Sequence, residues 1–387
     1  MRLIPEIDAF KDELTSWRRH LHENPELGYE ERDTARFVAE KLRAFGVDEV
    51  HEGIGETGVV GVLRAGKGEG SVLFRADMDA LPIEEETNLP YASKRPGTMH
   101  ACGHDGHTTM LLGAARHLAA SRDFDGTVYL MFQPAEEGKG GAKAMLDEGL
   151  LERFPAERVF GLHNWPSLPF GRFAMPETAA MAAVDEFLIT LTGKGGHAAM
   201  PHQTRDPLLA GCGLVQALQG IVSRETDPLD RAVLSVTTFN AGHAHNVIPE
   251  TATIGGTVRS FLPETRARIE ERIQAVADAL ALAHRVSAET SYRHGYPATV
   301  NHPAEAGIGA DAAARVVGED GVERAPLPAM VAEDFAYLLE AKPGSYVWMG
   351  TGGEAGLHSP HFDFNDEALP IGASYWVRLA SALLPAA

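Results

Sequence analysis

Cysteine is scarce in this 387-residue chain, which contains only Cys102 and Cys212. Two cysteines cannot build a disulfide framework, so the composition predicts a protein of a reducing compartment, the cytoplasm. Long apolar runs are absent as well. No stretch approaches the roughly 18 residues of a membrane-spanning helix, and the segment up to His22 lacks the apolar core of a secretory signal. We therefore expect neither a membrane span nor export.

Positive charge is also in short supply. The chain has 34 Lys and Arg residues against 54 Asp and Glu residues, which gives a formal net charge of −20. A nucleic-acid backbone would repel such a surface, so nucleic acid is excluded as a partner. Small anionic substrates stay open, because bound metal ions can reverse the local field. The length suffices for about two domains.

Strand-like and helix-like stretches alternate over the first half of the chain. We expect helices at 6–22, 30–45, 108–120 and 141–150, and strands at 59–63, 71–75, 127–132 and 158–162. This alternation predicts an α/β fold, with a sheet that carries helices on its faces.

A different pattern begins near residue 183. It predicts strand, helix, strand, strand, helix and strand, at 186–192, 206–222, 232–239, 253–260, 263–283 and 285–293. This βαββαβ order is that of a ferredoxin-like unit. The α/β pattern returns after Pro297, with a strand at 345–349 and a helix at 366–384. We therefore expect an α/β/α domain with a mixed sheet (1–182 and 295–387), interrupted by an inserted ferredoxin-like α+β domain (183–294).

Histidine is clustered. Three of the 17 histidines lie within His100–His107, where an even distribution would place fewer than one. In the same window Cys102-Gly103-His104 puts a thiolate and an imidazole two residues apart in a glycine-containing turn, so both could bind one metal ion. Taken alone, the motif fits equally well a buried cysteine beside a helix N-terminus.

Four further polar motifs lie next to apolar runs: Asp77-Met78-Asp79, Glu136-Glu137, His163-Asn164, and Leu357-His358-Ser-Pro-His361. Two adjacent carboxylates cannot point the same way, so one could face a metal ion and the other a substrate water. An isolated Glu-Glu pair is also typical of a solvated acidic turn. Because ligands of open α/β sheets bind beyond the carboxyl ends of strands, the shared placement favours one metal site.

These segments together resemble the aminoacylase and carboxypeptidase-G type of dinuclear metallohydrolases. Within that type they are most similar to the branch of hippurate hydrolases, bacterial N-acyl-amino-acid amidohydrolases and plant auxin-conjugate hydrolases. The similarity covers nearly the whole chain, in the motifs Arg19–Leu27, Arg75–Pro82, Met99–His107, Phe132–Gly138, Gly195–Ala198, Asn246–Pro249 and His361.

The resemblance implies an amidohydrolase that cleaves the amide bond of a small N-acyl amino acid. A carboxypeptidase or dipeptidase with the same site is the alternative. A non-catalytic metal- or ligand-binding relative is a further one, which the presence of Glu136 beside a full ligand set disfavours.

Position by position, the resemblance implies two divalent metal ions per subunit, with Zn, Mn, Co and Ni all suited to mixed S, N and O donors. The implied ligands are Cys102, His104, Glu137, His163 and His361. Glu136 would be the general base, and Asp79 would orient a ligand or the base. Many relatives have His-x-Asp at Asp77-Met78-Asp79 and a bridging Asp at Cys102, although the named branch shares both changes. Whether Cys102 bridges both ions, and whether Asp77 is more than structural, stays open.

The expected inserted domain adds three candidates. The resemblance implies that His197 stabilises the oxyanion, and Asn246 and Arg259 look like groups that hold a substrate carboxylate. The resemblance and the open sheet edge of a ferredoxin-like unit predict a lid and dimerisation domain in a homodimer, with a tetramer as the alternative. His197 would then complete the partner's site, although action in its own subunit stays open.

Overall fold

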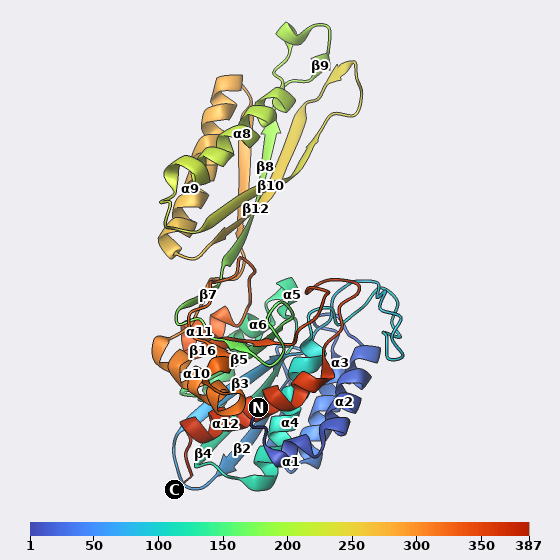
Figure 1. Cartoon of the computed structure of the whole chain (residues 1–387). Coiled ribbons are helices and arrows are strands. Elements are labelled where there is room, and N and C mark those ends of the chain that lie inside the picture. Colours follow the sequence, from blue (N-terminus) through green and yellow to red (C-terminus); the bar gives the residue numbers. More distant parts are fainter. Residues whose placement is uncertain (387) are drawn as a thin grey trace. The chain divides into compact units, whose positions relative to one another are not determined.

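Residues 1–386 are described by the computed structural model shown in Figure 1. The chain divides into two compact units. The first comprises Met1–Ala180, Thr299–Pro328 and Asp334–Ala387, and the second comprises Met181–Ala298 and Ala329–Glu333. No helix among the described residues combines the length and the apolar character needed to cross a membrane.

The first unit is built on a mixed sheet of eight strands in the order β1-β2-β4-β3-β5-β16-β6-β15. The strands are β1 (Glu49–Ile54), β2 (Gly58–Ala65), β3 (Ser71–Asp77), β4 (Gly126–Gln133), β5 (Arg158–Trp165), β6 (Phe173–Ala174), β15 (Val322–Glu323) and β16 (Gly344–Gly350). The central strands β4, β3, β5 and β16 run parallel to one another, whereas β2 is antiparallel to both β1 and β4. All residues of β3 and β16 are buried, as expected of parallel strands with both faces covered.

Helices of the first unit pack on this sheet. They are α1 (Pro5–Asp8), α2 (Lys11–Glu23), α3 (Arg32–Ala44), α4 (His104–Ser121), α5 (Glu136–Lys139), α6 (Gly141–Asp147), α7 (Leu150–Arg153), α10 (Pro303–Val317), α11 (Ala336–Ala341) and α12 (Leu369–Leu383). Helices α4 and α12 contact each other and β3, while α3 packs on β2 and α10 on β16. Trp376 of α12 packs against Phe74 of β3, with ring centroids 4.9 Å apart and the rings tilted by 31°, inside the main hydrophobic core.

The predicted α/β fold with a mixed sheet is confirmed, with local differences. The helix expected over 6–22 is interrupted at Ala9–Phe10, because Phe10 has the non-helical angles φ −113° and ψ 24°. Strand β1 was not predicted. It is an edge strand whose first five residues are exposed or half-buried, so it lacks the apolar signature of a strand. The region 141–150 forms two short helices in place of one.

The second unit has four antiparallel strands in the order β10-β12-β8-β13. Along the chain its elements are β8 (Ala183–Thr192), α8 (Pro207–Glu225), β10 (Ala232–Ala241), β12 (Thr251–Ser260), α9 (Pro263–His284) and β13 (Ser287–His294). Asp206 caps α8 by accepting the N–H groups of Leu208 and Leu209. Both helices bury an apolar face, which includes Leu214 and Ile269, in a separate core.

Short strands complete the fold. In the second unit β9 (Gly196–His197) pairs with β11 (Val247–Ile248). Strand β7 (Ala179–Met181) pairs with β14 (Thr299–Val300).

Candidate metal centre

The carboxyl ends of three parallel strands meet at one edge of the first unit's sheet. Strand β3 ends at Asp77, β4 leads into the turn that carries Glu136 and Glu137, and β5 carries His163 near its end. Helix α4 begins at His104 beside them. This edge is where ligands of open α/β sheets bind, since the loops that follow the strands converge there.

The glycine of the Cys102-Gly103-His104 motif has a steric purpose. Gly103 adopts the left-handed conformation, with a φ of 89°, and forms the N-cap of α4. A Cβ atom at this position would lie 2.3 Å from Oδ1 of Asn164. Only glycine therefore allows the chain to turn into α4 so close to β5 and to bring the thiol and the imidazole together.

Thiol, imidazole and carboxylate groups gather here. The ligand atoms of Cys102, His104 and His163 lie within 4.8 Å of one another, and so do those of His104, Glu136 and Glu137. The distance from Sγ of Cys102 to Nε2 of His163 is 3.4 Å. The side chain of His104 is fully buried, and its Nε2 has no hydrogen-bond partner among the described residues. A divalent cation would satisfy this nitrogen, so the donor set fits a metal ion.

Hydrogen bonds orient the donors. Nδ1 of His104 lies 3.2 Å from Oδ1 of Asp79, while Oδ2 of the same carboxylate accepts the backbone N–H of Glu137 at 2.9 Å. Nδ1 of His163 donates to the carbonyl of Asn164 at 2.6 Å. Because both imidazoles use Nδ1 in this way, each has Nε2 left for a metal ion. The structure thus places Asp79 between two of the expected ligands.

Burial and neighbouring charges shift the protonation of this cluster. Burial raises the pKa of the Cys102 thiol well above its usual value, and the nearby carboxylates of Glu137 and Glu136 add to the shift. For His104, burial favours the neutral form, but the carboxylates of Asp77 and Asp79 outweigh it and raise the pKa to about 10. A metal ion that binds these two groups must displace their protons, so we expect its affinity to rise with pH.

Asp77 is engaged in a buried network beside the cluster. Its carboxylate accepts from Arg75 at 2.6 Å and from Nδ1 of His107 at 2.5 Å. Nε2 of His107 lies 2.7 Å from Oδ1 of Asn164. Asp77 therefore compensates a buried guanidinium and orients His107, and its Oδ2 also lies 3.7 Å from Nε2 of His104.

His361, an expected ligand, is not brought to the cluster. Its side chain is 61% exposed, and its Nε2 lies 3.6 Å from Oε2 of Glu86. His358 occupies the expected place: its Nε2 is 3.2 Å from Oε1 of Glu137, and it groups with Cys102 and Glu137 within 4.8 Å. The structure therefore brings His358, and not the expected His361, to the donor cluster.

The backbone conformation of His358 accounts for its position at the cluster. His358 has a φ of 62°, a left-handed conformation that is uncommon for a non-glycine residue. Its N–H donates to the carbonyl of Ala101 at 2.8 Å, which fixes the loop beside Cys102. Both histidines lie in an irregular loop. The sequence spacing therefore could not predict which of the two side chains lies at the cluster.

The remaining candidates lie in the second unit. His197, on β9, is exposed, and its Nδ1 accepts the N–H of Ala199 at 3.1 Å. Asn246 is exposed just before the paired strand β11, and its carbonyl accepts the N–H of Ala198 at 3.0 Å. His197 and Asn246 are therefore neighbours. Arg259 lies on a different strand, β12, half-buried, and its Nη1 donates to the carbonyl of Val258 at 3.1 Å.

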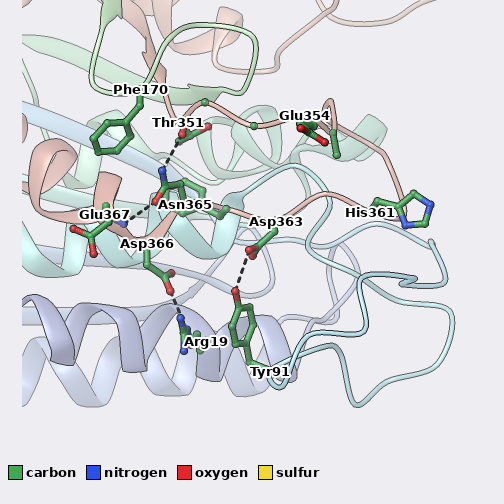
Figure 2. A pocket seen from close by; sticks show the side chains of 14 residues that line it. Arg19, Tyr91, Phe170, Thr351, Glu354, His361, Asp363, Asn365, Asp366 and Glu367 are labelled. Carbon is green, nitrogen blue, oxygen red and sulfur yellow. Dashed lines mark hydrogen bonds and ion pairs between the residues drawn. The ribbon is translucent and has the colours of Figure 1, made fainter.

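A surface hollow of about 720 Å³ lies elsewhere in the first unit (Figure 2). Its lining comprises Arg19, Tyr91, Phe170, Thr351–Ala355, His361 and Asp363–Glu367. Its polar groups largely pair with one another: Arg19 donates to Asp366 at 2.8 Å and the Tyr91 hydroxyl to Asp363 at 3.0 Å. Of the expected ligands, His361 alone lines it, so the hollow is distinct from the donor cluster.

Comparisons with known proteins agree on one family. Residues 73–382 match the sequence profile of peptidase family M20/M25/M40. The chain is 45% identical to a hippurate hydrolase of Campylobacter jejuni, over 98% of this chain and 99% of that protein. It is 42% identical to IAA-amino acid hydrolase ILR1-like 5 of Arabidopsis thaliana, over 97% of this chain and 88% of that protein.

A solved structure has the same fold. It is the YXEP protein of Bacillus subtilis, described as a dinuclear metal binding peptidase from the M20 family. The two chains share 36% identity and superpose with a TM-score of 0.86, over 97% of this chain and 99% of that one.

Proposed function

Since this chain belongs to peptidase family M20/M25/M40, we propose that it hydrolyses the amide bond of small N-acyl amino acids, with Glu136 as general base. The resemblance seen in the motifs is confirmed by this membership, and the chain is a metal-dependent, amide-cleaving hydrolase. The relatives named hippurate hydrolase and IAA-amino acid hydrolase support an acylated amino acid over the carboxypeptidase or dipeptidase alternative.

The observation that carries the proposal is the cluster of mixed donors with a second carboxylate beside it. We assign two divalent ions per subunit, from among Zn, Mn, Co and Ni, to Cys102, His104, His163, Glu137 and His358. Cys102 belongs both to the group with His104 and His163 and to the group with Glu137 and His358, so its thiolate would help to hold the metal at this centre. Free thiols are typical of proteins of a reducing compartment, which supports a cytoplasmic location.

The chain's own residues divide the chemistry. Divalent ions held here would lower the pKa of a water molecule toward neutrality and polarise the amide carbonyl. Glu136 takes the proton from the attacking water and delivers it to the nitrogen of the leaving amine. Asp79 holds the imidazole of His104 and the backbone of Glu137 in place during these transfers.

The test is Glu136→Gln, compared with Glu137→Gln. An amide cannot accept the proton, so Glu136→Gln should keep its metal ions and lose about 10²–10⁴-fold in kcat. Glu137→Gln should lose metal. The substrates are N-acetyl, N-benzoyl and indole-acetyl amino acids, with dipeptides as the contrasting set. Near-wild-type kcat in Glu136→Gln would rule out Glu136 as the general base. Exclusive cleavage of dipeptides would favour the peptidase alternative.

The second unit supplies the remainder of the proposal. We take it to be an inserted ferredoxin-like lid and dimerisation domain, because its βαββαβ order forms a sheet whose strands β10 and β13 are open edges. Two such edges can pair across a twofold axis and close a homodimer. In this proposal His197 stabilises the oxyanion in the partner's site, and Asn246 and Arg259 hold the substrate carboxylate.

Complementation tests this arrangement. Inactive His197→Ala and Glu136→Gln subunits, mixed under subunit exchange, should regain up to about a quarter of wild-type activity through heterodimers with one intact site. No recovery despite demonstrated exchange would mean that His197 acts in its own subunit's site, or not at all. Sedimentation of the wild type distinguishes a dimer from a tetramer.

A further inference from the structure

The segment Glu26–Glu31 has no part in the steps above, yet it contacts two loops of the metal centre. The segment overlaps the Arg19–Leu27 motif and continues beyond it. Its first residues, Glu26 and Leu27, contact the loop that follows β3. The N–H of Ala80 donates to the carbonyl of Glu26 at 2.8 Å, and Leu27 forms a parallel bridge with Ala80. The segment thereby fixes the chain directly after Asp79.

Its last residue, Glu31, contacts the turn that carries the proposed base. The Glu31 side chain is fully buried, and its Oε1 accepts the N–H of Ala135 at 2.8 Å. Its Oε2 accepts the hydroxyl of Thr57 at 2.6 Å. The backbone of Glu31 is itself the N-cap of α3, so the carboxylate is held by a regular helix.

Ala135 needs such a partner. Its φ of 55° puts a non-glycine residue in the left-handed region directly before Glu136. That conformation is unfavourable for a residue with a Cβ atom and persists only where the surroundings impose it. The hydrogen bond to Glu31 satisfies a backbone donor that is buried at this point of the turn.

The same segment holds the other end of the turn. Nζ of Lys139 donates to the carbonyl of Gly28 at 2.7 Å, and the hydroxyl of Tyr29 donates to the carbonyl of Lys139 at 3.1 Å. The fit is close: a Cβ atom on Gly28 would lie 3.0 Å from Cα of Ala135. The turn of Ala135–Lys139 is therefore set from outside by Gly28–Glu31.

We propose that Glu31 is a positioning residue for catalysis: by accepting the N–H of Ala135 it holds the turn that aims Glu136 and Glu137. The inference rests on the proposed role of Glu136 as general base. Glu31 belongs to none of the donor groups of the centre, and its effect passes through the backbone of Ala135. Reacting groups tolerate little displacement, since a shift of about 1 Å can lower the rate about 100-fold.

The nature of this hydrogen bond decides which variants are informative. Burial raises the pKa of Glu31 to about 7, so a large share of these carboxyl groups is uncharged at neutral pH. Gln at this position keeps an oxygen for the N–H of Ala135, and the Thr57 hydroxyl can rotate to accept from its amide. Ala keeps neither bond.

The experiment compares Glu31→Ala, Glu31→Gln and Thr57→Val by kcat, KM, metal affinity and thermal unfolding. At saturating metal, Glu31→Ala should lose about 10- to 100-fold in kcat, with KM changed less than about threefold. Its metal affinity should fall about tenfold because Glu137 lies on the same turn. Glu31→Gln should retain kcat within about threefold. Thr57→Val removes the other hydrogen bond of Glu31, and should lower Tm while keeping kcat within about twofold.

A second variant keeps the test decisive should Glu31→Ala fail to fold. Gly28→Ala adds a methyl group that must displace Ala135 by a few tenths of an ångström, and should lower kcat about tenfold in a folded protein. Wild-type kcat in Glu31→Ala or in Gly28→Ala overturns the proposal, as does a loss in Thr57→Val equal to that in Glu31→Ala. If Glu31→Gln lost as much kcat as Glu31→Ala, the proposed hydrogen bond would be overturned, and the negative charge of Glu31 would be the cause of the loss. Full activity in Glu136→Gln would instead refute the proposed base.

Discussion

Replacing each histidine of the Leu357–His361 motif in turn separates the two candidate ligands. His358 lies with its Nε2 3.2 Å from Oε1 of Glu137 and within the donor group of Cys102. His361 sits three residues further on, with its side chain 61% exposed beside Glu86. The substitutions His358→Ala and His361→Ala are thus a matched pair in one loop, and only the first removes a group from the cluster.

The size of the effect follows from what the two side chains contact. Loss of a residue that merely orients a metal ligand costs about 10- to 100-fold in affinity or activity. Loss of a direct donor should therefore cost at least about 100-fold, which is about 2.8 kcal/mol at 1.4 kcal/mol for each tenfold change. His361→Ala removes an exposed side chain, and should change metal affinity less than about threefold.

The assay is competition with a chelator of known affinity, followed by metal analysis of the dialysed protein. We expect His358→Ala to keep less metal than the wild type and to lose turnover, with His361→Ala close to the wild type in both. Thermal unfolding of the two apo proteins controls for a general loss of structure. The reverse order, with His361→Ala losing metal and His358→Ala keeping it, would refute the placement derived from the structure.

Two further outcomes follow from the buried groups. Because the pKa of the buried Cys102 thiol is raised, a thiol reagent should modify Cys102 of the apo protein slowly and faster at alkaline pH, and metal should abolish this labelling, while the exposed Cys212 reacts in both states as an internal control; the same labelling rate of Cys102 with and without metal would make it structural. Burial lowers the pKa of His22, but hydrogen bonds to Asp105 and Glu85 outweigh it and raise the pKa to about 9. Since the folded pKa exceeds the unfolded value, His22 stabilises the fold below about pH 6.5 and loses this contribution as pH rises through about 9. The free energy of unfolding should therefore fall more steeply between pH 7 and 9.5 in the wild type than in His22→Gln, and parallel profiles would contradict this.

Much of the fold and part of the site could be predicted from local patterns. Apolar runs bounded by turns mark β3, β4 and β5, because buried parallel strands leave a continuous hydrophobic signal. Cys102 and His104 are two residues apart, so their proximity is a local property of a glycine turn. Glu136 follows β4 and His163 lies near the end of β5, two parallel strands that flank β3, so the α/β rule places both residues at the same edge of the sheet. Residues at the carboxyl ends of parallel strands can therefore be expected at one edge of the sheet from the sequence pattern alone.

Tertiary structure alone decided the rest. His358 and His361 are indistinguishable by spacing in an irregular loop. Only the folded loop brings His358 to the cluster, where its N–H donates to the carbonyl of Ala101, 257 positions away in the chain. The contact of Glu31 with Ala135 spans 104 residues and involves a helix cap and a left-handed turn. Sequence periodicity reports which face of an element is apolar, and it carries nothing about which loops meet. Loops meet where packed helices and strands hold their ends, so the place of His358 beside Cys102 and the contact of Glu31 with Ala135 emerge only when the whole unit has folded.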